Sequence, residues 1–268
     1  IPLMDEKLVE EAMKKAKELD VPISLHEEDP AYIKQPGVNQ GKVSEQLNYG
    51  GASYLAEAVM VKRDCELAVK TGAKVDIQHI SSGVAVDYVK EAKEKGANVY
   101  AEASPHHFTL TEEAVLKYGT LARMNPPLRT EEDRQRIIKG LQEGTIEIIA
   151  TDHAPHSKEE KDKPLDQAPS GITGIETSLA LGVTELVEKG YLSMMQLLEK
   201  MTVNPAKLYN MEQGRLQEGK PADVVLFDPE EEWEVKEYKS KATNSPFTGW
   251  KLKGKVKYTI CDGKIIEL

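Results

Sequence analysis

Cysteines and long apolar runs are scarce in this sequence of 268 residues, and each shortage excludes a class of protein. Only Cys65 and Cys261 occur, with no CxxC spacing, so neither a disulfide framework nor a cysteine-based zinc finger is expected. No run approaches the roughly 18 apolar residues of a membrane-spanning helix. The glycine-rich motifs of nucleotide-binding loops and the GxSxG motif of serine hydrolases are also absent.

Acidic residues outnumber basic residues by 45 to 35, which gives a net charge of -10. This balance disfavours a general binder of nucleic acids or anionic membranes. With 40% hydrophobic and 30% charged residues, the composition is that of a folded globular protein. Together with the low cysteine content, these features predict a cytoplasmic protein with no nucleic-acid or membrane partner.

The beginning of the chain also carries information. The first residue is Ile1 rather than Met, and a helical pattern begins almost at once. Residues 1–25 contain acidic side chains and no apolar signal-peptide core. We therefore expect this chain to be the C-terminal part of a longer protein.

Short apolar segments alternate with amphipathic segments through the first 151 residues. The apolar segments predict strands at 21–25, 74–80, 98–103 and 146–151. The amphipathic segments predict helices at 5–19, 51–70, 83–95, 111–118 and 130–143, the last opening on a capping box at Thr130. This alternation is typical of a parallel sheet with right-handed crossovers. A closed barrel of this type needs eight strands, so half of such a barrel would be missing.

The remaining residues follow two further patterns. The polar segment 157–171, with Pro164, Pro169 and Gly171, predicts a long mobile loop of the kind that forms a lid. Helices are expected at 174–188, 194–201 and 204–210, and short strands at 222–227, 233–235, 256–260 and 264–266. The change of pattern predicts a catalytic partial barrel over 1–212 and a small β-rich module over 213–268.

Residues able to bind a metal lie at the ends of three of the four predicted strands: His26 and Asp152 follow theirs directly, and His79 lies near the end of 74–80. The carboxyl ends of parallel strands meet at one edge, where ligands of α/β proteins bind. Imidazole nitrogens and a carboxylate are the ligands of hydrolytic zinc sites, and Asp152 is also suited to accept a proton from water. The alternative is that Asp152 caps a turn and that the nearby histidines lie on the surface.

Several neighbouring residues leave alternatives open. The run Glu27-Glu28-Asp29 either orients a histidine or forms a solvated acidic turn, which is the more common arrangement. Pro126 and Pro127 would hold Asn125 rigidly as a donor and acceptor for an amide-like substrate, or the segment is a plain turn. Arg129 contacts either substrate or acidic neighbours. His106 and His107 are expected either to orient residues of the site from behind or to have a structural role.

Nine stretches, in order along the chain, resemble the amidohydrolase superfamily and more closely its dihydroorotases of the long bacterial class. They are LHEED (25–29), QHIS (78–81), SPHH (104–107), MNPPLR (124–129), ATDHAPH (150–156), PSGITGIET (169–177), NPAKLYN (204–210), GRLQEGKPADVVLFDP (214–229) and NSPFTGWKLKGKV (244–256). The resemblance implies an α/β fold, namely strands 5–8 of a TIM-type (β/α)8 metal-dependent hydrolase barrel, with a β-rich C-terminal module.

The same resemblance implies a role for each candidate residue. His26 and His79 would bind one Zn2+, and Asp152 would bind the other and act as general base and acid. Substrate contacts would come from Asn125, His156, Ser170 and Gly171. The site would hold one or two zinc ions, whose remaining ligands would lie upstream of Ile1.

The activity implied by the resemblance is the reversible interconversion of dihydroorotate and N-carbamoyl-aspartate in pyrimidine biosynthesis. We expect it only together with the missing N-terminal half, in a homodimer, with aspartate transcarbamoylase as a candidate partner. The alternatives are a hydantoinase or allantoinase type of cyclic amidase and a non-catalytic dihydroorotase-like subunit.

Overall fold

The computed structural model describes residues 4–267, which fall into two compact units. The first unit spans Ile1–Gly174 and Ser240–Pro246, and the second spans Ile175–Lys239 and Phe247–Leu268, with residues 1–3 and 268 outside the described residues. The domain boundary expected at 212–213 stays a prediction. None of the helices within residues 4–267 combines the length and the apolar character that a bilayer crossing needs.

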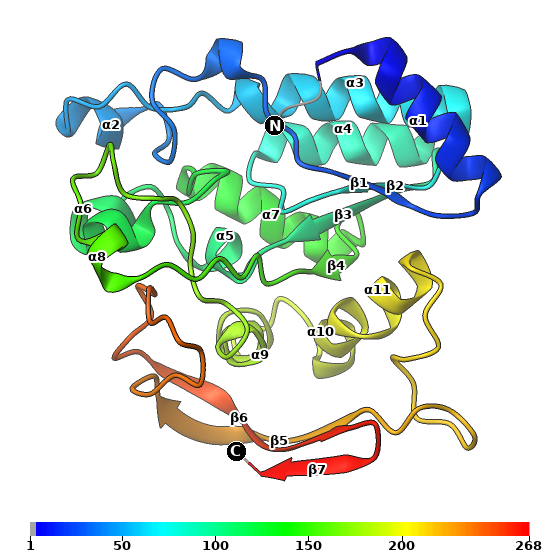
Figure 1. The fold of residues 1–268 in the computed structure, drawn as a ribbon, viewed down its shortest axis with the longest axis vertical. Helices are drawn as coiled ribbons and strands as arrows, with labels where there is room; N and C mark the ends of the chain where they lie inside the picture. The colour runs from blue at the N-terminus through cyan, green and yellow to red at the C-terminus, as the bar shows by residue number, and fades with distance from the viewer. Residues whose placement is uncertain (1–3, 268) are drawn as a thin grey trace. The chain divides into compact units, whose positions relative to one another are not determined.

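The first unit contains the predicted four-stranded parallel sheet (Figure 1). Its strands follow one another in chain order, and they are β1 (Ile23–Leu25), β2 (Val75–Ile77), β3 (Val99–Ala103) and β4 (Ile148–Ile149). Most of these strands are shorter than predicted. At β2 and β4 the backbone turns into the left-handed region soon after the strand, with φ 32° at His79 and φ 47° at Asp152.

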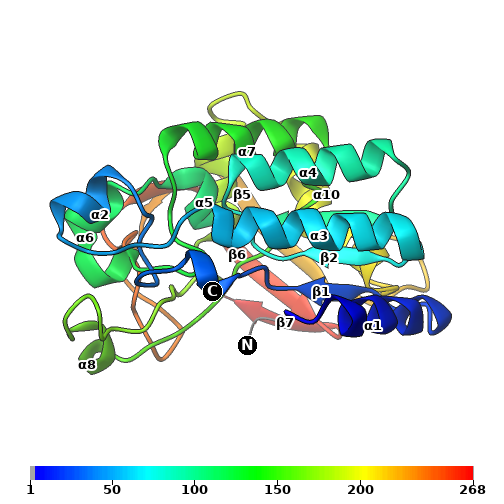
Figure 2. The ribbon, with the colours of Figure 1, turned by 90° about the horizontal axis from the view of Figure 1, so that it is seen from above.

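Four helices lie side by side over one face of this sheet (Figure 2). In order they are α1 (Glu6–Glu18), α3 (Leu55–Thr71), α4 (Gly83–Glu94) and α7 (Glu131–Glu143), each close to its predicted range. The predicted capping box of α7 is confirmed, because the Thr130 hydroxyl accepts from the Asp133 amide. The apolar faces of the helices bury side chains such as Val9 and Met13 against the sheet, whose Val75 and Ile77 are fully buried.

Short helices in the connecting segments differ from the predictions. The structure adds η1 (Pro30–Tyr32), α2 (Lys42–Gln46), α5 (Pro105–Thr109), η2 (Gly119–Ala122) and α8 (Lys158–Lys161), and the helix expected at 111–118 is α6 (Ala114–Tyr118). Elements of three to five residues are too short to show a helical repeat in the sequence. The loop 157–171 therefore begins with a helical turn rather than with irregular chain.

The second unit combines helices with an antiparallel sheet. Its helical part comprises α9 (Ser178–Gly182), the π-helical turn η3 (Val183–Val187), α10 (Met194–Met201) and α11 (Val203–Leu208). Its sheet has the order β5 (Val224–Glu234), β6 (Lys251–Cys261), β7 (Lys264–Glu267). The strands expected at 222–227 and 233–235 are one strand, β5, with a register shift between Asp228 and Glu232.

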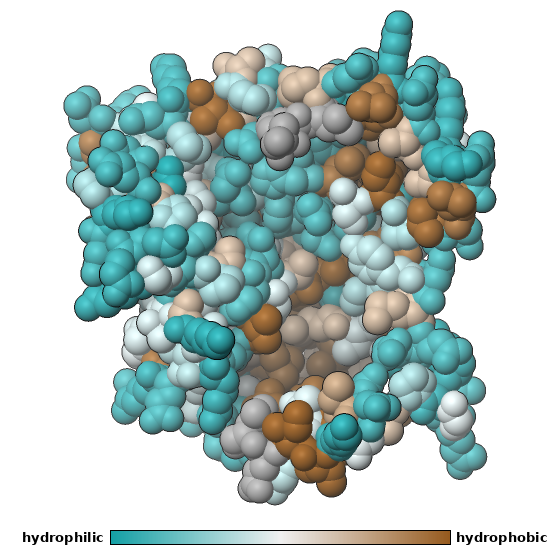
Figure 3. Space-filling view, in the orientation of Figure 1, coloured by the Kyte–Doolittle hydropathy of each residue, from teal (hydrophilic) through white to brown (hydrophobic). Residues whose placement is uncertain are grey.

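The molecular face in Figure 3 is mostly hydrophilic, with apolar side chains gathered in separate groups. One group lies over α1, where Leu8 and Leu19 are exposed. Another lies over β7, where Ile265 and Ile266 are exposed. Each group lies within a single unit of the chain.

Candidate active site

Two predicted metal ligands meet at the carboxyl edge of the parallel sheet. His26 follows β1 directly and His79 follows β2 by two residues, and the pairing of Leu25 with Ile77 brings the two strand ends level. His26 Nδ1 lies 3.0 Å from His79 Nε2. The rings meet edge to face, with centroids 4.8 Å apart. The sequence prediction that these histidines converge is confirmed.

The backbone at this edge is held in an uncommon conformation. His79 and Asp152 both have positive φ, a region that costs a non-glycine residue about 1–2 kcal/mol. Such residues concentrate at functional sites, where the surrounding structure holds them in place. The two chemically important strand ends share this feature.

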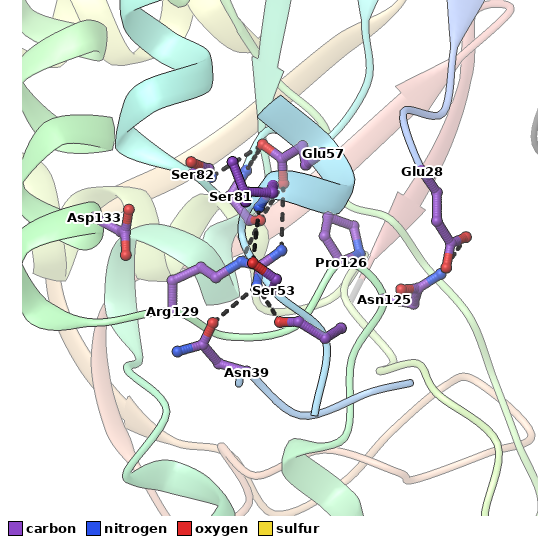
Figure 4. A network of polar contacts seen from close by, with 12 residues as sticks. Glu28, Asn39, Ser53, Glu57, Ser81, Ser82, Asn125, Pro126, Arg129 and Asp133 are labelled. Atoms are coloured by element: carbon purple, nitrogen blue, oxygen red, sulfur yellow. Dashed lines mark hydrogen bonds and ion pairs between the residues drawn. The ribbon is translucent and has the colours of Figure 1, made fainter. Parts of the chain in front are cut away.

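Glu28 orients His26 and joins it to Asn125. Glu28 Oε2 lies 3.1 Å from His26 Nε2 and accepts a hydrogen bond of 3.3 Å from Asn125 Nδ2. Figure 4 shows the Asn125 and Glu28 side chains pointing at each other. The bond with His26, followed by that with Asn125, lowers the pKa of Glu28 against the effect of burial. A plain solvated turn is therefore wrong for Glu28, which orients the histidine.

The carboxylate of Glu27, the residue before Glu28, lies in different surroundings. Glu27 is buried, and its carboxyl group faces Asp64 of α3. Burial, reinforced by Asp64, raises the pKa of Glu27 well above its ordinary value. Glu27 and Glu28 thus belong to different surroundings although they are neighbours in the sequence.

The histidine pair fits a zinc ion as two of its ligands. Two nitrogens bound to tetrahedral zinc at about 2.0–2.1 Å are separated by about 3.3 Å, close to the separation found here. His79 Nδ1 is buried and has no hydrogen-bond partner within residues 4–267. Burial lowers the pKa of His79 to about 4, so the ring is neutral at pH 7, the form that binds metals.

Asp152 does not complete that group. In the part of the chain that the structure describes, no group of three or more His, Cys, Asp or Glu side chains is arranged to hold a metal ion. Burial raises the pKa of Asp152, and the charge that His26 can carry opposes this increase. The role of Asp152 as a zinc ligand and proton acceptor stays a prediction.

The expected substrate-contacting residues His156, Ser170 and Gly171 lie together. His156 Nε2 donates to the Ser170 carbonyl oxygen at 2.9 Å. Asn244 Oδ1 accepts from the His156 amide at 3.0 Å, and Asn244 Nδ2 donates to the Gly171 carbonyl oxygen at 3.1 Å. Asn244 therefore connects the segment at His156 with the segment at Gly171. This role was not predicted from the sequence, because Asn244 lies far along the chain from both segments.

Two basic residues hold the end of the segment 157–171. Lys161 Nζ donates to the carbonyl oxygens of Pro169 (2.9 Å) and Gly171 (3.2 Å), and Arg123 donates to that of Ala168. The Gly171 amide donates to the Arg123 carbonyl oxygen at 3.0 Å. The segment is thus tied to the chain that leads to Asn125, and its opening as a lid stays a prediction.

The residues around Asn125 show how its segment is supported. His107 Nε2 donates to the Pro126 carbonyl oxygen at 3.0 Å, so His107 has the structural role expected for the buried pair His106 and His107. Arg129 contacts acidic surroundings, with Nη2 4.0 Å from Glu57 Oε2, and this alternative is confirmed. A small cavity of about 10 Å³ lies between Asn125 and Arg129, with room for roughly one water molecule.

Comparisons with known proteins agree with this arrangement. The model of the amidohydrolase family matches residues 4–266. The chain is 67% identical over 266 residues to the dihydroorotase of Clostridioides difficile and 54% identical over 267 residues to that of Clostridium acetobutylicum. Each match covers 99% of this chain and 63% of the relative, so the chain spans less than two thirds of those proteins.

Solved structures match the whole described fold. The L-hydantoinase (dihydropyrimidinase) of Arthrobacter aurescens has a TM-score of 0.86 at 25% identity, covering 100% of this chain and 61% of that chain. The dihydropyrimidinase of Brevibacillus agri has a TM-score of 0.84 at 25% identity, covering 98% and 60%. The parallel sheet and the small antiparallel sheet of this chain thus correspond to about three fifths of the longer fold seen in those solved structures.

Proposed function

Because the chain belongs to the amidohydrolase family, we propose that it is the C-terminal part of a zinc-dependent dihydroorotase, carrying strands 5–8 of a (β/α)8 barrel. The observation that carries this proposal is the approach of His26 Nδ1 to His79 Nε2 at the carboxyl edge of the parallel sheet. Ligands bind at this edge in (β/α) barrels. The identity of 67% to a dihydroorotase supports this activity.

The reaction would open or close the ring of dihydroorotate. In the opening direction, the oxygen of water bonds to the ring carbonyl carbon, the carbon–nitrogen bond breaks, and the ring nitrogen gains a proton. Asp152 would take the proton from water and deliver it to that nitrogen. His26 and His79 would hold a zinc ion together with ligands from the preceding part of the protein, and such an ion would supply polarisation of the carbonyl and acidification of water.

The other site residues would position the substrate. Asn125 supplies an amide donor whose direction is fixed by Glu28. His156, Ser170 and Gly171 supply a second group of contacts, held together by Asn244. These two groups would bind opposite ends of one small ring compound, with His156 the candidate to bind its carboxylate.

Two alternatives remain to be separated from this proposal. A hydantoinase or allantoinase activity would agree with the solved structures, but the dihydroorotase relatives are the more similar, at 50–67% identity. A substrate panel on the whole protein distinguishes them. A non-catalytic subunit would retain no zinc, which metal analysis detects. Homodimer formation, association with aspartate transcarbamoylase and a cytoplasmic location stay predictions.

The test is Asp152→Asn in the protein that carries this chain together with the N-terminal part present in its relatives. We expect turnover to fall by about 10²–10⁴-fold with zinc retained, because a positioned general base contributes that much. Asp166→Asn, which changes an exposed carboxylate, is the control. Unchanged turnover of dihydroorotate by the zinc-loaded Asp152 variant would contradict the proposal. The 268 residues alone should show negligible activity.

A further inference from the structure

A buried carboxylate on α3 shapes the turn that follows His79. Glu57 is only 3% exposed, and its carboxylate accepts hydrogen bonds from the amides of Ser81 (2.9 Å) and Ser82 (3.0 Å) and from the Ser81 hydroxyl. Ser82 is the N-cap of α4 but makes no side-chain cap. Glu57 therefore holds the two residues that lead into α4, while the first helical amide, that of Gly83, donates to Asp133 Oδ1 at 2.9 Å. Negative charge near a helix N-terminus is favourable.

The sheet and this turn together hold the backbone around His79: the amides of Gln78 and Ile80 donate to the Leu25 and Glu102 carbonyl oxygens of the neighbouring strands, and Glu57 holds the residues that follow. Strand β2 ends at Ile77, and His79 then adopts its left-handed backbone conformation. Two residues later the chain is fixed by Glu57. A left-handed residue between a strand and a capped helix keeps its conformation only while both sides are held.

A buried guanidinium, that of Arg129, belongs to the same network (Figure 4). Arg129 Nε donates to the Ser81 hydroxyl at 3.1 Å, and Nη1 donates to Asn39 Oδ1 and to the Ala52 carbonyl oxygen, both at 2.8 Å. Arg129 lies four residues after Asn125, and the intervening Pro126 and Pro127 restrict the backbone. The position of Arg129 is therefore transmitted to Asn125.

We propose that Glu57 and Arg129 are positioning residues that hold His79 and Asn125 in a fixed relation through the shared Ser81 hydroxyl. The inference rests on the proposed function for the statement that His79 binds zinc and Asn125 binds substrate. The way in which Glu57 and Arg129 hold the His79 and Asn125 side chains does not depend on the proposed function. Glu57 and Arg129 line the same small cavity as His26, Glu28 and Asn125, so the network borders the site directly.

Stability alone does not account for these two charges. A buried ion pair loses so much hydration that apolar side chains of similar size often serve the fold equally well. Here the two groups are 4.0 Å apart and direct most of their hydrogen bonds to the turn and to the loop 39–52, not to each other. Such an arrangement fixes the position of the turn relative to the loop 39–52.

The experiment compares Arg129→Lys and Ser81→Ala with Glu147→Gln in the protein that carries this chain. Lys retains the charge but cannot donate along both directions used by Arg129, and Ala removes only the shared hydroxyl. Glu147 is a largely buried carboxylate before β4, at the opposite end of the strands, paired with Lys93. It is the control for general destabilisation. Histidine and asparagine are labelled with nitrogen-15, so the imidazole of His79 and the amide of Asn125 are observed directly by NMR.

We expect both the His79 and the Asn125 signals to shift in Arg129→Lys and in Ser81→Ala, and to stay in place in Glu147→Gln. Zinc affinity, measured by chelator competition, should fall about 10–100-fold in the first two variants, the usual effect of removing support behind a metal ligand. Unmoved His79 and Asn125 signals in either folded variant overturn the inference. Shifted signals in a protein that binds no zinc uphold the positioning role and contradict the proposed zinc hydrolase.

Discussion

The two ends of the parallel strands in the first unit differ in how their polar groups are used. At the carboxyl end, His79 and Asp152 have left-handed backbones, and His26 and Glu28 join in side-chain hydrogen bonds. At the amino end of β4, Glu147 forms an ion pair with Lys93 in a backbone without positive φ. Asp20, which precedes β1, also has positive φ, so the gathering of candidate ligands is what distinguishes the carboxyl end. Changes there should impair function, whereas changes at the other should impair mainly stability.

The largest effect that sharpens this comparison is expected from Gly171→Ala. Gly171 has φ 136°, and an added Cβ would lie 2.6 Å from Ala154 Cβ and 3.1 Å from His156 Nε2. We expect kcat/KM for dihydroorotate to fall about 100-fold, the effect of misplacing a site by about 1 Å. Steady-state kinetics of the whole protein measure it.

The control for this change is Gly96→Ala. Gly96 also has positive φ, 83°, but nothing lies within 4 Å of an added Cβ. It should lower the free energy of unfolding by about 1 kcal/mol while leaving kcat/KM intact. Equal kinetic defects in the two variants would show that backbone strain, and not contact with His156, decides the result.

A smaller effect of the opposite kind is expected from Glu147→Gln. The change leaves Lys93, which is largely buried, without its charged partner. The free energy of unfolding should decrease by about 1–3 kcal/mol, with kcat/KM unchanged. Urea unfolding measures the first quantity. Changing the more exposed Glu143, paired with Lys90, to Gln should lower the free energy of unfolding less than Glu147→Gln does. An active-site defect in Glu147→Gln without loss of stability would reverse the comparison.

A pH-dependent effect is expected from Lys161, which supports the loop beyond β4. Burial lowers the pKa of Lys161 to about 8, from an ordinary value of 10.5 in the unfolded chain. Between these values the unfolded chain binds more protons, so this residue makes the free energy of unfolding rise with pH. The rise should be missing in Lys161→Met. Urea unfolding of both proteins across this range gives the difference, and parallel pH profiles would exclude the assigned titration.

The sequence predicted the parallel sheet and the meeting of His26 with His79 because both depend on a strong local pattern. Each strand is an apolar run such as Ile146–Ala150, and each histidine follows its run at once or within a few residues. Parallel strands then bring their ends together without further information. The same argument predicted Asp152 at this edge, but not the left-handed backbone that directs its side chain.

Contacts between distant segments were beyond the reach of the sequence. The acidic run 27–29 looks the same whether it is solvated or, as at Glu28, bonded to Asn125 almost a hundred residues later. Lys161 lies in a run of charged residues, and nothing local distinguishes it from its exposed neighbours. Short elements such as α5 and α8 contain too few residues to show a period.

The hydrogen bonds around Ser81 differ in how much chain they span. Glu57 lies 24 residues before Ser81, whereas Arg129 lies 48 residues after it. The closer pairing encloses a shorter loop and has the smaller entropic cost of closure. A nascent chain that has emerged from the ribosome only through α4 already contains both Glu57 and the serine amides that it accepts from, so these contacts require no residue that is synthesised later.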